Sequence, residues 1–90
     1  MIKHYDITVK GKVQGVWFRK STLEKAHQLG INGIVKNQND GSVYIEAEGE
    51  DTQLQLFLKW CAKGPEYAVV DEVSTTETEI LAYKDFQIRY

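Results

Sequence analysis

Arg19 follows a short loop that contains two glycines, and this combination suits the binding of an anion. The loop begins at Gly11 and includes Gly15. Arginine presents a planar fork of N–H donors that matches two oxygens of a phosphate. The first backbone N–H groups of a helix lack partners within the helix and favour negative charge. The pattern indicates a phosphate site, although a surface arginine at an ordinary strand–helix turn has the same spacing.

The elements around Arg19 are predicted by the periodicity of the apolar residues. Alternation of apolar and polar residues predicts strands over residues 5–10, 31–37, 43–47 and 86–90, and a run rich in Val and Thr predicts another over 69–79. Helical spacing predicts one helix over residues 18–29 and a second that has Asp51 or Thr52 as its N-cap and is closed by Gly64-Pro65. Asp40-Gly41 is a strong hairpin signal between the second and third strands.

This order of elements predicts an α+β fold of the ferredoxin-like, split βαβ type, with a short last strand added. We expect residues 1–90 to form one domain, with an antiparallel sheet and both helices on one face. In a right-handed strand–helix–strand unit the two strands run parallel, so their carboxyl ends lie at the same end of the sheet. Asn37 finishes the second strand and is therefore expected to lie near the loop and Arg19.

Two blocks of the sequence resemble the acylphosphatase family. The run from Gly11 to Arg19, Gly-Lys-Val-Gln-Gly-Val-Trp-Phe-Arg, matches the signature of that family, and the run from Gly33 to Asn37, followed by Asp40-Gly41, matches its second block. Two spaced blocks and a matching length are far more specific than a lone glycine motif. The resemblance continues at residues 46–49, 57–58, 64–65 and 71–73, and so covers nearly the whole chain.

The resemblance implies hydrolysis of the carboxyl–phosphate anhydride of small acyl phosphates, with no metal ion and no organic cofactor. It implies that Arg19 binds the phosphoryl group and that Asn37 orients the attacking water. It also implies that inorganic phosphate is both product and inhibitor. The backbone amides that would complete the phosphate site are those of Gln14, Gly15, Val16, Trp17 and Phe18.

Trp17 departs from the pattern of the family, because many relatives carry a small residue such as glycine or cysteine there. The backbone N–H of Trp17 is retained, but its indole is expected to crowd or cover the pocket. The range of substrates and the turnover rate, rather than the reaction itself, are expected to differ.

The remaining titratable residues are interpreted as structural. His4 is expected to be a strand residue and His27 to lie on a helix surface, because the two do not have metal-ligand spacing. Asp40 is expected to support its turn, and Glu46 and Glu48 alternate on the polar face of a strand. Catalysis by paired carboxylates therefore has little support.

Composition and charge narrow the class of protein. The single cysteine, Cys61, allows no intramolecular disulfide and is expected to be a buried apolar filler. Residues 1–37 carry seven basic and two acidic side chains, whereas residues 38–90 carry four and eleven, so an anion site is expected in the first third. No membrane-spanning run or signal peptide is found, and a cytoplasmic monomer is the default expectation.

Two other functions remain as alternatives. RNA-recognition domains share this strand order, but Tyr5 and Tyr44 do not form the required aromatic motif and the chain has a net charge of −2, so no nucleic acid partner is expected. A non-catalytic anion-binding or regulatory domain would keep the loop. Acylphosphatase-like segments also occur within larger carbamoyl-transferring proteins, but here a free-standing enzyme is preferred.

Overall fold

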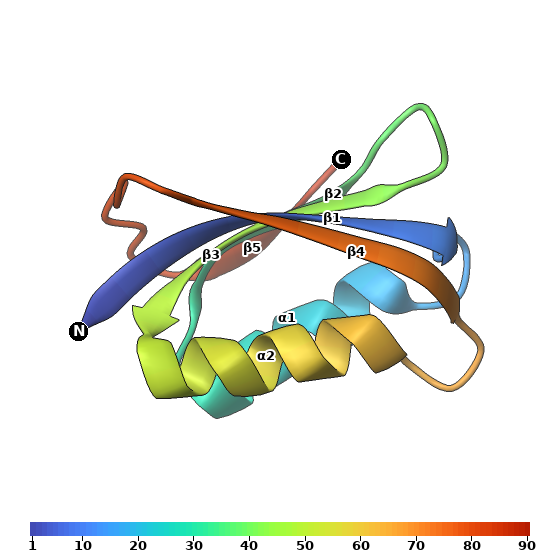
Figure 1. Ribbon diagram of the computed structural model, residues 1–90. Helices are drawn as coiled ribbons and strands as arrows, with labels where there is room; N and C mark the ends of the chain where they lie inside the picture. Colours follow the sequence, from blue (N-terminus) through green and yellow to red (C-terminus); the bar gives the residue numbers. More distant parts are fainter.

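The computed structural model describes residues 1–90, which form a five-stranded sheet with two helices packed on one face (Figure 1). The elements follow the predicted order. They are β1 (Ile2–Lys12), α1 (Phe18–Leu29), β2 (Asn32–Asn37), β3 (Val43–Glu50), α2 (Asp51–Lys63), β4 (Val69–Thr78) and β5 (Phe86–Arg89). The prediction of a ferredoxin-like α+β fold is confirmed. The N-cap of α2 is Glu50, one residue before Asp51, the earlier of the two predicted N-cap residues. The helix therefore begins at Asp51.

The sheet has the order β4-β1-β3-β2-β5 and differs from the prediction in one respect. The strand pairs β1–β3, β1–β4 and β2–β3 are antiparallel, as expected for the split βαβ arrangement. The short strand β5 instead pairs parallel to the outer edge of β2, so the sheet is mixed. Because β1 and β2 both run antiparallel to β3, they are parallel to each other, and their carboxyl ends meet at one rim.

The two faces of the central strands differ sharply in polarity. On the helix side, cross-strand pairs such as Ile7–Ile45 and Val9–Val43 are fully buried in the single core. Successive side chains of a strand point to opposite faces. The alternate pairs His4–Glu48 and Asp6–Glu46 therefore share the far face of the sheet.

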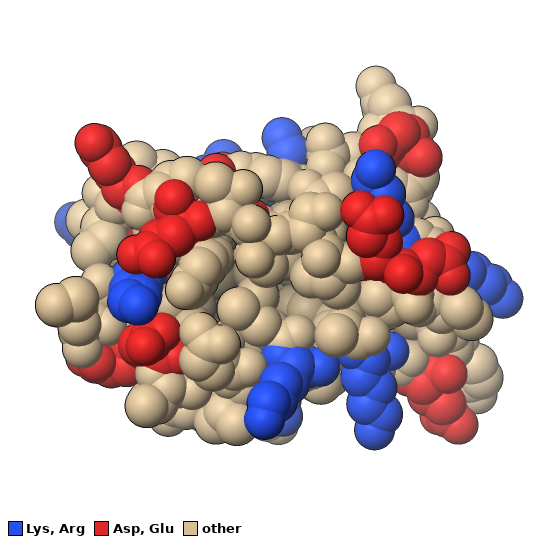
Figure 2. Space-filling model, viewed as in Figure 1, with Lys and Arg blue, Asp and Glu red and all other residues tan.

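The aromatic residues considered for RNA binding are separated by the same alternation. Tyr5 pairs with Ala47 and packs against the core, whereas Tyr44 pairs with Thr8 on the far face. The face seen in Figure 2 carries acidic and basic side chains interleaved, without a continuous basic stripe. Neither feature favours a nucleic acid surface. Neither α1 nor α2 has the length and hydrophobicity of a membrane-spanning helix.

Candidate active site

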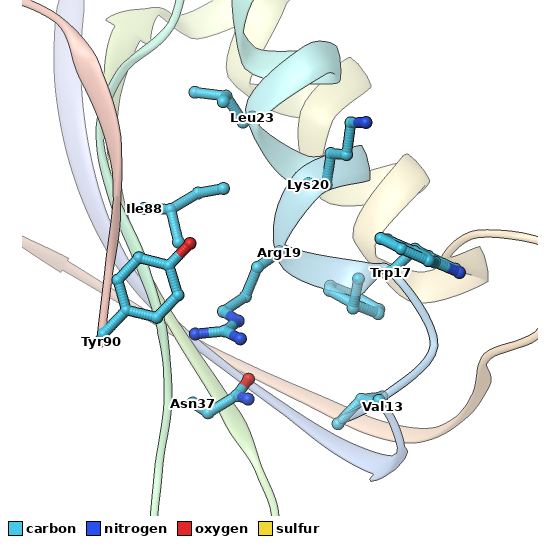
Figure 3. Close-up of a pocket in the computed structure, with 10 residues that line it drawn as sticks. Val13, Trp17, Arg19, Lys20, Leu23, Asn37, Ile88 and Tyr90 are labelled. Atoms are coloured by element: carbon cyan, nitrogen blue, oxygen red, sulfur yellow. The ribbon is translucent and has the colours of Figure 1, made fainter.

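A cavity of about 520 Å³ opens where the carboxyl ends of β1 and β2 meet the beginning of α1 (Figure 3). It brings together Arg19 from the first turn of α1 and Asn37 from the end of β2. The loop between β1 and α1 forms another wall. The convergence that the topology predicted is therefore present. The volume lies within the range of small-molecule sites.

Two glycines shape the loop that joins β1 to α1. At Gly11 the pairing of β1 with β4 shifts register, and a Cβ there would lie 2.1 Å from the carbonyl oxygen of Val69. Gly15 has a φ of 73°, a backbone conformation that other residues rarely adopt. The close approach of β4 requires glycine at position 11, whereas the backbone angle favours glycine at position 15, so the two glycines of the motif have distinct structural roles.

The backbone amides of the loop have no protein partner. None of the N–H groups of Gln14, Gly15, Val16, Trp17 and Phe18 donates a hydrogen bond to another protein group, and no side chain caps α1. The first turn of α1 also contains no acidic residue. Unpartnered N–H groups at the positive end of a helix form a site that suits an anion.

The side chain of Gln14 fastens the loop to the β2–β3 hairpin. Its Nε2 donates hydrogen bonds to the carbonyl oxygens of Gln38, at 2.7 Å, and Ser42, at 2.9 Å. The Asp40 carboxylate in turn accepts hydrogen bonds from the backbone N–H and the hydroxyl of Ser42, which lower the pKa of Asp40. Asp40 thus supports its turn, as predicted. The hairpin end of β2, and Asn37 with it, is held beside the loop.

Arg19 is half-buried and has no acidic partner. None of the ion pairs of the chain includes its guanidinium, which lies 4.7 Å from the centroid of the Tyr90 ring. The adjacent Phe18 is buried against Trp60 and anchors the start of the helix. Figure 3 shows the guanidinium between the Tyr90 ring and the Asn37 carboxamide. A partly buried arginine without a carboxylate is suited to an anionic ligand.

Asn37 presents a buried oxygen to the same cavity. Its backbone pairs with Val43, so its side chain lies on the helix side of the sheet, and its Oδ1 has no hydrogen-bond partner. A buried acceptor without a partner costs about 1–3 kcal/mol. Such exceptions are few in native proteins and call for an explanation, such as a water or ligand that supplies the missing donor.

Trp17 adopts a left-handed conformation, with φ 64° and ψ 20°, at the N-cap of α1. This conformation is unusual for a bulky residue and typical of glycine. Trp17 is 71% exposed and lies at the rim of the cavity, where the Lys20 ammonium sits 6.0 Å from the centroid of the indole ring system. Trp17 therefore lines the cavity mouth without filling it.

Five residues of the cavity wall were not predicted as site residues: Val13, Lys20, Leu23, Ile88 and Tyr90. Leu23 of α1, Ile88 of β5 and Tyr90 form an apolar side beside Arg19. Leu23 lies one turn after Arg19, a spacing that could have identified it. Ile88 and Tyr90 depend on the parallel pairing of β5 with β2, which no local pattern predicts.

The other candidate nucleophile and ligand residues lie away from the cavity. Cys61 is buried in the core, and burial raises the pKa of its thiol to about 12, which confirms its structural role. His27 is exposed in the last turn of α1, as predicted.

A second polar cluster, which sequence analysis did not find, lies on the far face of the sheet. His4 is only 1% exposed, and its Nδ1 donates to the Glu48 carboxylate at 2.7 Å. Glu48 is 4% exposed and also accepts the backbone N–H groups of Leu81 and Tyr83. Glu48 lies on the polar face of β3, as predicted, but it is buried there. The segment of residues 79–85, which joins β4 to β5, covers this carboxylate.

Burial in this cluster opposes charge on both His4 and Glu48. For His4, hydrogen bonds to Glu48 and Asp6 outweigh that cost and raise its pKa. For Glu48, burial is likewise outweighed by the hydrogen bonds from His4 and the two backbone N–H groups, which lower its pKa. The two groups stabilise each other as an ion pair.

The chain is similar in sequence and in structure to known acylphosphatases. The sequence model of the acylphosphatase family matches residues 5–88. An acylphosphatase of Marinobacter nauticus is 53% identical over 84% of this chain and 83% of its own, and one of Thermotoga petrophila is 49% identical over 99% of each. The crystal structure of an acylphosphatase from Bacillus subtilis superposes with a TM-score of 0.95 and 37% identity over the full length of both chains.

Proposed function

The chain belongs to the acylphosphatase family of hydrolases, and we propose that Arg19, Asn37 and the backbone amides of residues 14–18 hydrolyse small acyl phosphates. The observation that carries the proposal is that two polar groups without protein partners lie in one cavity. The Arg19 guanidinium has no acidic partner, and the buried Oδ1 of Asn37 has no donor.

The phosphoryl group of the substrate binds between the loop and Arg19. Its oxygens accept hydrogen bonds from the guanidinium fork and from the backbone N–H groups of residues 14–18, which have no protein partner. Of these residues, Gly15, Trp17 and Phe18 line the cavity. These donors are held in place before substrate arrives, because Gln14 ties the loop to the hairpin and Phe18 anchors the helix. Preorganised donors of this kind stabilise the charge that spreads over the equatorial oxygens during transfer.

Asn37 positions the nucleophile. The water molecule donates one hydrogen bond to Oδ1 of Asn37, which directs a lone pair of its oxygen toward phosphorus. As the new O–P bond forms, the bond between phosphorus and the acyl oxygen breaks and the carboxylate departs. The proton of the water passes to an oxygen of the phosphoryl group, and the products are a carboxylate and inorganic phosphate.

The protein need not supply an acid or a base for this reaction. A carboxylate is a good leaving group, so its departure needs no proton. Arg19 stays protonated and cannot act as a base, and a neutral carboxamide does not accept a proton usefully. Charge stabilisation by Arg19 and the amides, together with orientation by Asn37, is sufficient for such a substrate. Turnover is therefore proposed to need no metal ion.

The proposal is tested by phosphate release from benzoyl phosphate in the presence of EDTA. We expect full activity with the chelator, competitive inhibition by inorganic phosphate, and negligible hydrolysis of a phosphate monoester such as p-nitrophenyl phosphate. Loss of activity on chelation would contradict metal independence. Efficient hydrolysis of the monoester would contradict the proposed dependence on a good leaving group.

The proposal extends to the working form of the protein. We propose that residues 1–90 act as one domain and as a cytoplasmic monomer, without a nucleic acid or membrane partner. One core cluster joins the sheet to both helices, which supports a single domain. Analytical ultracentrifugation at the concentration of the activity assay tests the monomer, and fractionation of the source cells tests the location.

A further inference from the structure

Three metal-ligating side chains converge on the far face of the sheet, on the opposite side from the cavity. They are His4 and Asp6 of β1 and Glu46 of β3. The Nε2 of His4 lies 2.8 Å from Oδ1 of Asp6 and 3.7 Å from Oε1 of Glu46, and the three ligand atoms lie within 4.8 Å of one another. Ligands about 2.0–2.1 Å from a tetrahedral Zn²⁺ lie roughly 3.3 Å apart, so these separations bracket the required value.

We propose that His4 Nε2 and one carboxylate oxygen each of Asp6 and Glu46 bind a single divalent transition-metal ion, with Zn²⁺ as the representative. The combination of one imidazole with two carboxylates favours Zn²⁺ over Mg²⁺ and Ca²⁺, which prefer oxygen ligands and a larger number of them. This site is separate from the proposed catalytic one and supplies no group to hydrolysis.

The surroundings of His4 hold its ring in the orientation that a metal requires. Its other nitrogen, Nδ1, donates to Glu48, and Glu48 is itself fixed by the N–H groups of Leu81 and Tyr83. A carboxylate that accepts the second ring N–H is the usual partner of a metal-bound histidine, because it fixes the tautomer and the ring plane. Nε2 is thereby aimed at the two remaining carboxylates.

The carboxylate of Glu46 is also held in place by hydrogen bonds. The hydroxyl groups of Tyr83 and Tyr44 donate to its two oxygens, at 2.8 Å and 3.0 Å. Each of these oxygens retains a second lone pair for a metal. The side chain of Asp6 is 34% exposed, which leaves a path for the ion and a coordination position for water.

The charge of the cluster also favours a cation. Asp6, Glu46 and Glu48 contribute three carboxylates around a single imidazole. Two positive groups lie at its border: the Lys36 ammonium is 5.6 Å from the centroid of the Tyr44 ring, and Arg89 lies near Tyr83, where it opposes in small part the rise that burial causes in the pKa of Tyr83. An ion at the centre would replace the proton on Nε2 and balance the two carboxylates that face it.

Titration of the untagged full chain with ZnCl₂ in a non-coordinating buffer, followed by calorimetry, tests the proposal. We expect one equivalent to bind, a higher thermal midpoint with Zn²⁺, and no such response to Mg²⁺ or Ca²⁺ at the same concentration. In ¹⁵N-resolved NMR spectra, the Nε2 resonance of His4 should shift while Nδ1 keeps its proton. Hydrolysis of benzoyl phosphate should not change, because the site lies on the opposite face.

Asp6→Asn and Glu46→Gln remove one ligand each while preserving side-chain shape, and each should raise the Kd for Zn²⁺ at least about tenfold. The matched control, His27→Gln, removes the other histidine and should leave binding unchanged. Binding that survives both carboxylate variants, or that shifts His27 rather than His4, would overturn the proposal. Absence of binding to the correctly folded wild type at millimolar Zn²⁺ would overturn it as well.

Discussion

Asn37 and Glu48 lie on opposite faces of the same sheet and differ in how their oxygens are satisfied. The buried Oδ1 of Asn37 has no partner and faces the cavity, whereas the Glu48 carboxylate accepts hydrogen bonds from His4, Leu81 and Tyr83. Hydrogen bonds made within the protein stabilise the fold, and a group left without one remains available to a ligand. The difference separates the proposed catalytic site from a carboxylate that holds the chain together.

The same distinction applies to the neighbours of each residue. The backbone N–H groups of residues 14–18 have no hydrogen-bond partner in the protein, and the Arg19 guanidinium has no acidic partner. On the far face, His4, Asp6 and Glu46 contact one another, and Glu48 holds the 79–85 segment. Substitutions in the cavity should therefore change activity, and substitution of Glu48 should change stability.

Arg19→Lys should produce the largest effect. An ammonium keeps the charge but loses the two-pronged geometry, and we expect kcat/KM for benzoyl phosphate to fall about a thousandfold. Inhibition by inorganic phosphate should weaken in parallel. The matched control is Arg89→Lys, the same change at an exposed position on β5, which should leave both quantities unchanged. Near-normal activity and phosphate affinity in Arg19→Lys would make Arg19 an ordinary surface residue.

Glu48→Gln should show the opposite pattern. The substitution removes the charge that pairs with His4 and one of the oxygens that hold residues 81–83, so unfolding free energy should fall by about 2–3 kcal/mol. The kcat should stay within about twofold of wild type. Urea unfolding measures the first quantity, and Glu77→Gln on the exposed face of β4 is the control. A Glu48→Gln variant with unchanged stability and a reduced kcat would contradict the structural role of Glu48.

Trp17→Gly should have the smallest effect on stability. Glycine relieves the left-handed conformation, by about 1–2 kcal/mol, but increases the freedom of the unfolded chain, so the two contributions nearly cancel. Trp17→Ala also removes the indole but keeps the strained Cβ, and should unfold about 1 kcal/mol more easily than the glycine variant.

Trp17→Gly also tests the shape of the cavity mouth. Loss of the indole should widen the rim, and the ratio of kcat/KM for benzoyl phosphate to that for acetyl phosphate should rise several-fold, while phosphate inhibition persists. Loss of phosphate inhibition would instead mean that the indole holds the loop in shape.

Local patterns were sufficient to predict the elements and the place where the cavity forms. Period-two alternation located the strands, Gly30 marked the end of α1, and the right-handed crossover placed Asn37 beside Arg19. Asp40 and Cys61 also have the structural roles expected of them. In each case a short segment carries the information.

Features that depend on the register of distant strands were not predicted. His4 and Glu48 meet only because β1 and β3 pair in one particular register, and β5 reaches the cavity only because it pairs parallel to β2. One available signal was the i, i+2 spacing of polar residues on both strands, since residues two apart share a face. The backbone angles of Trp17 could not be predicted, because an indole carries no local preference for that conformation.

The most direct test of the proposed site compares three quantities on Asn37→Ala: the kcat, the inhibition constant of phosphate and the thermal midpoint. We expect kcat to fall by about 10²–10³, because the water loses its orienting group. The inhibition constant should stay close to that of wild type, since Arg19 and the loop remain, and the midpoint should not fall, since the lost oxygen had no protein partner. Asn39→Ala, in the adjoining hairpin turn, should leave all three unchanged. A normal kcat with a lowered midpoint would assign Asn37 to the turn and contradict its role in hydrolysis.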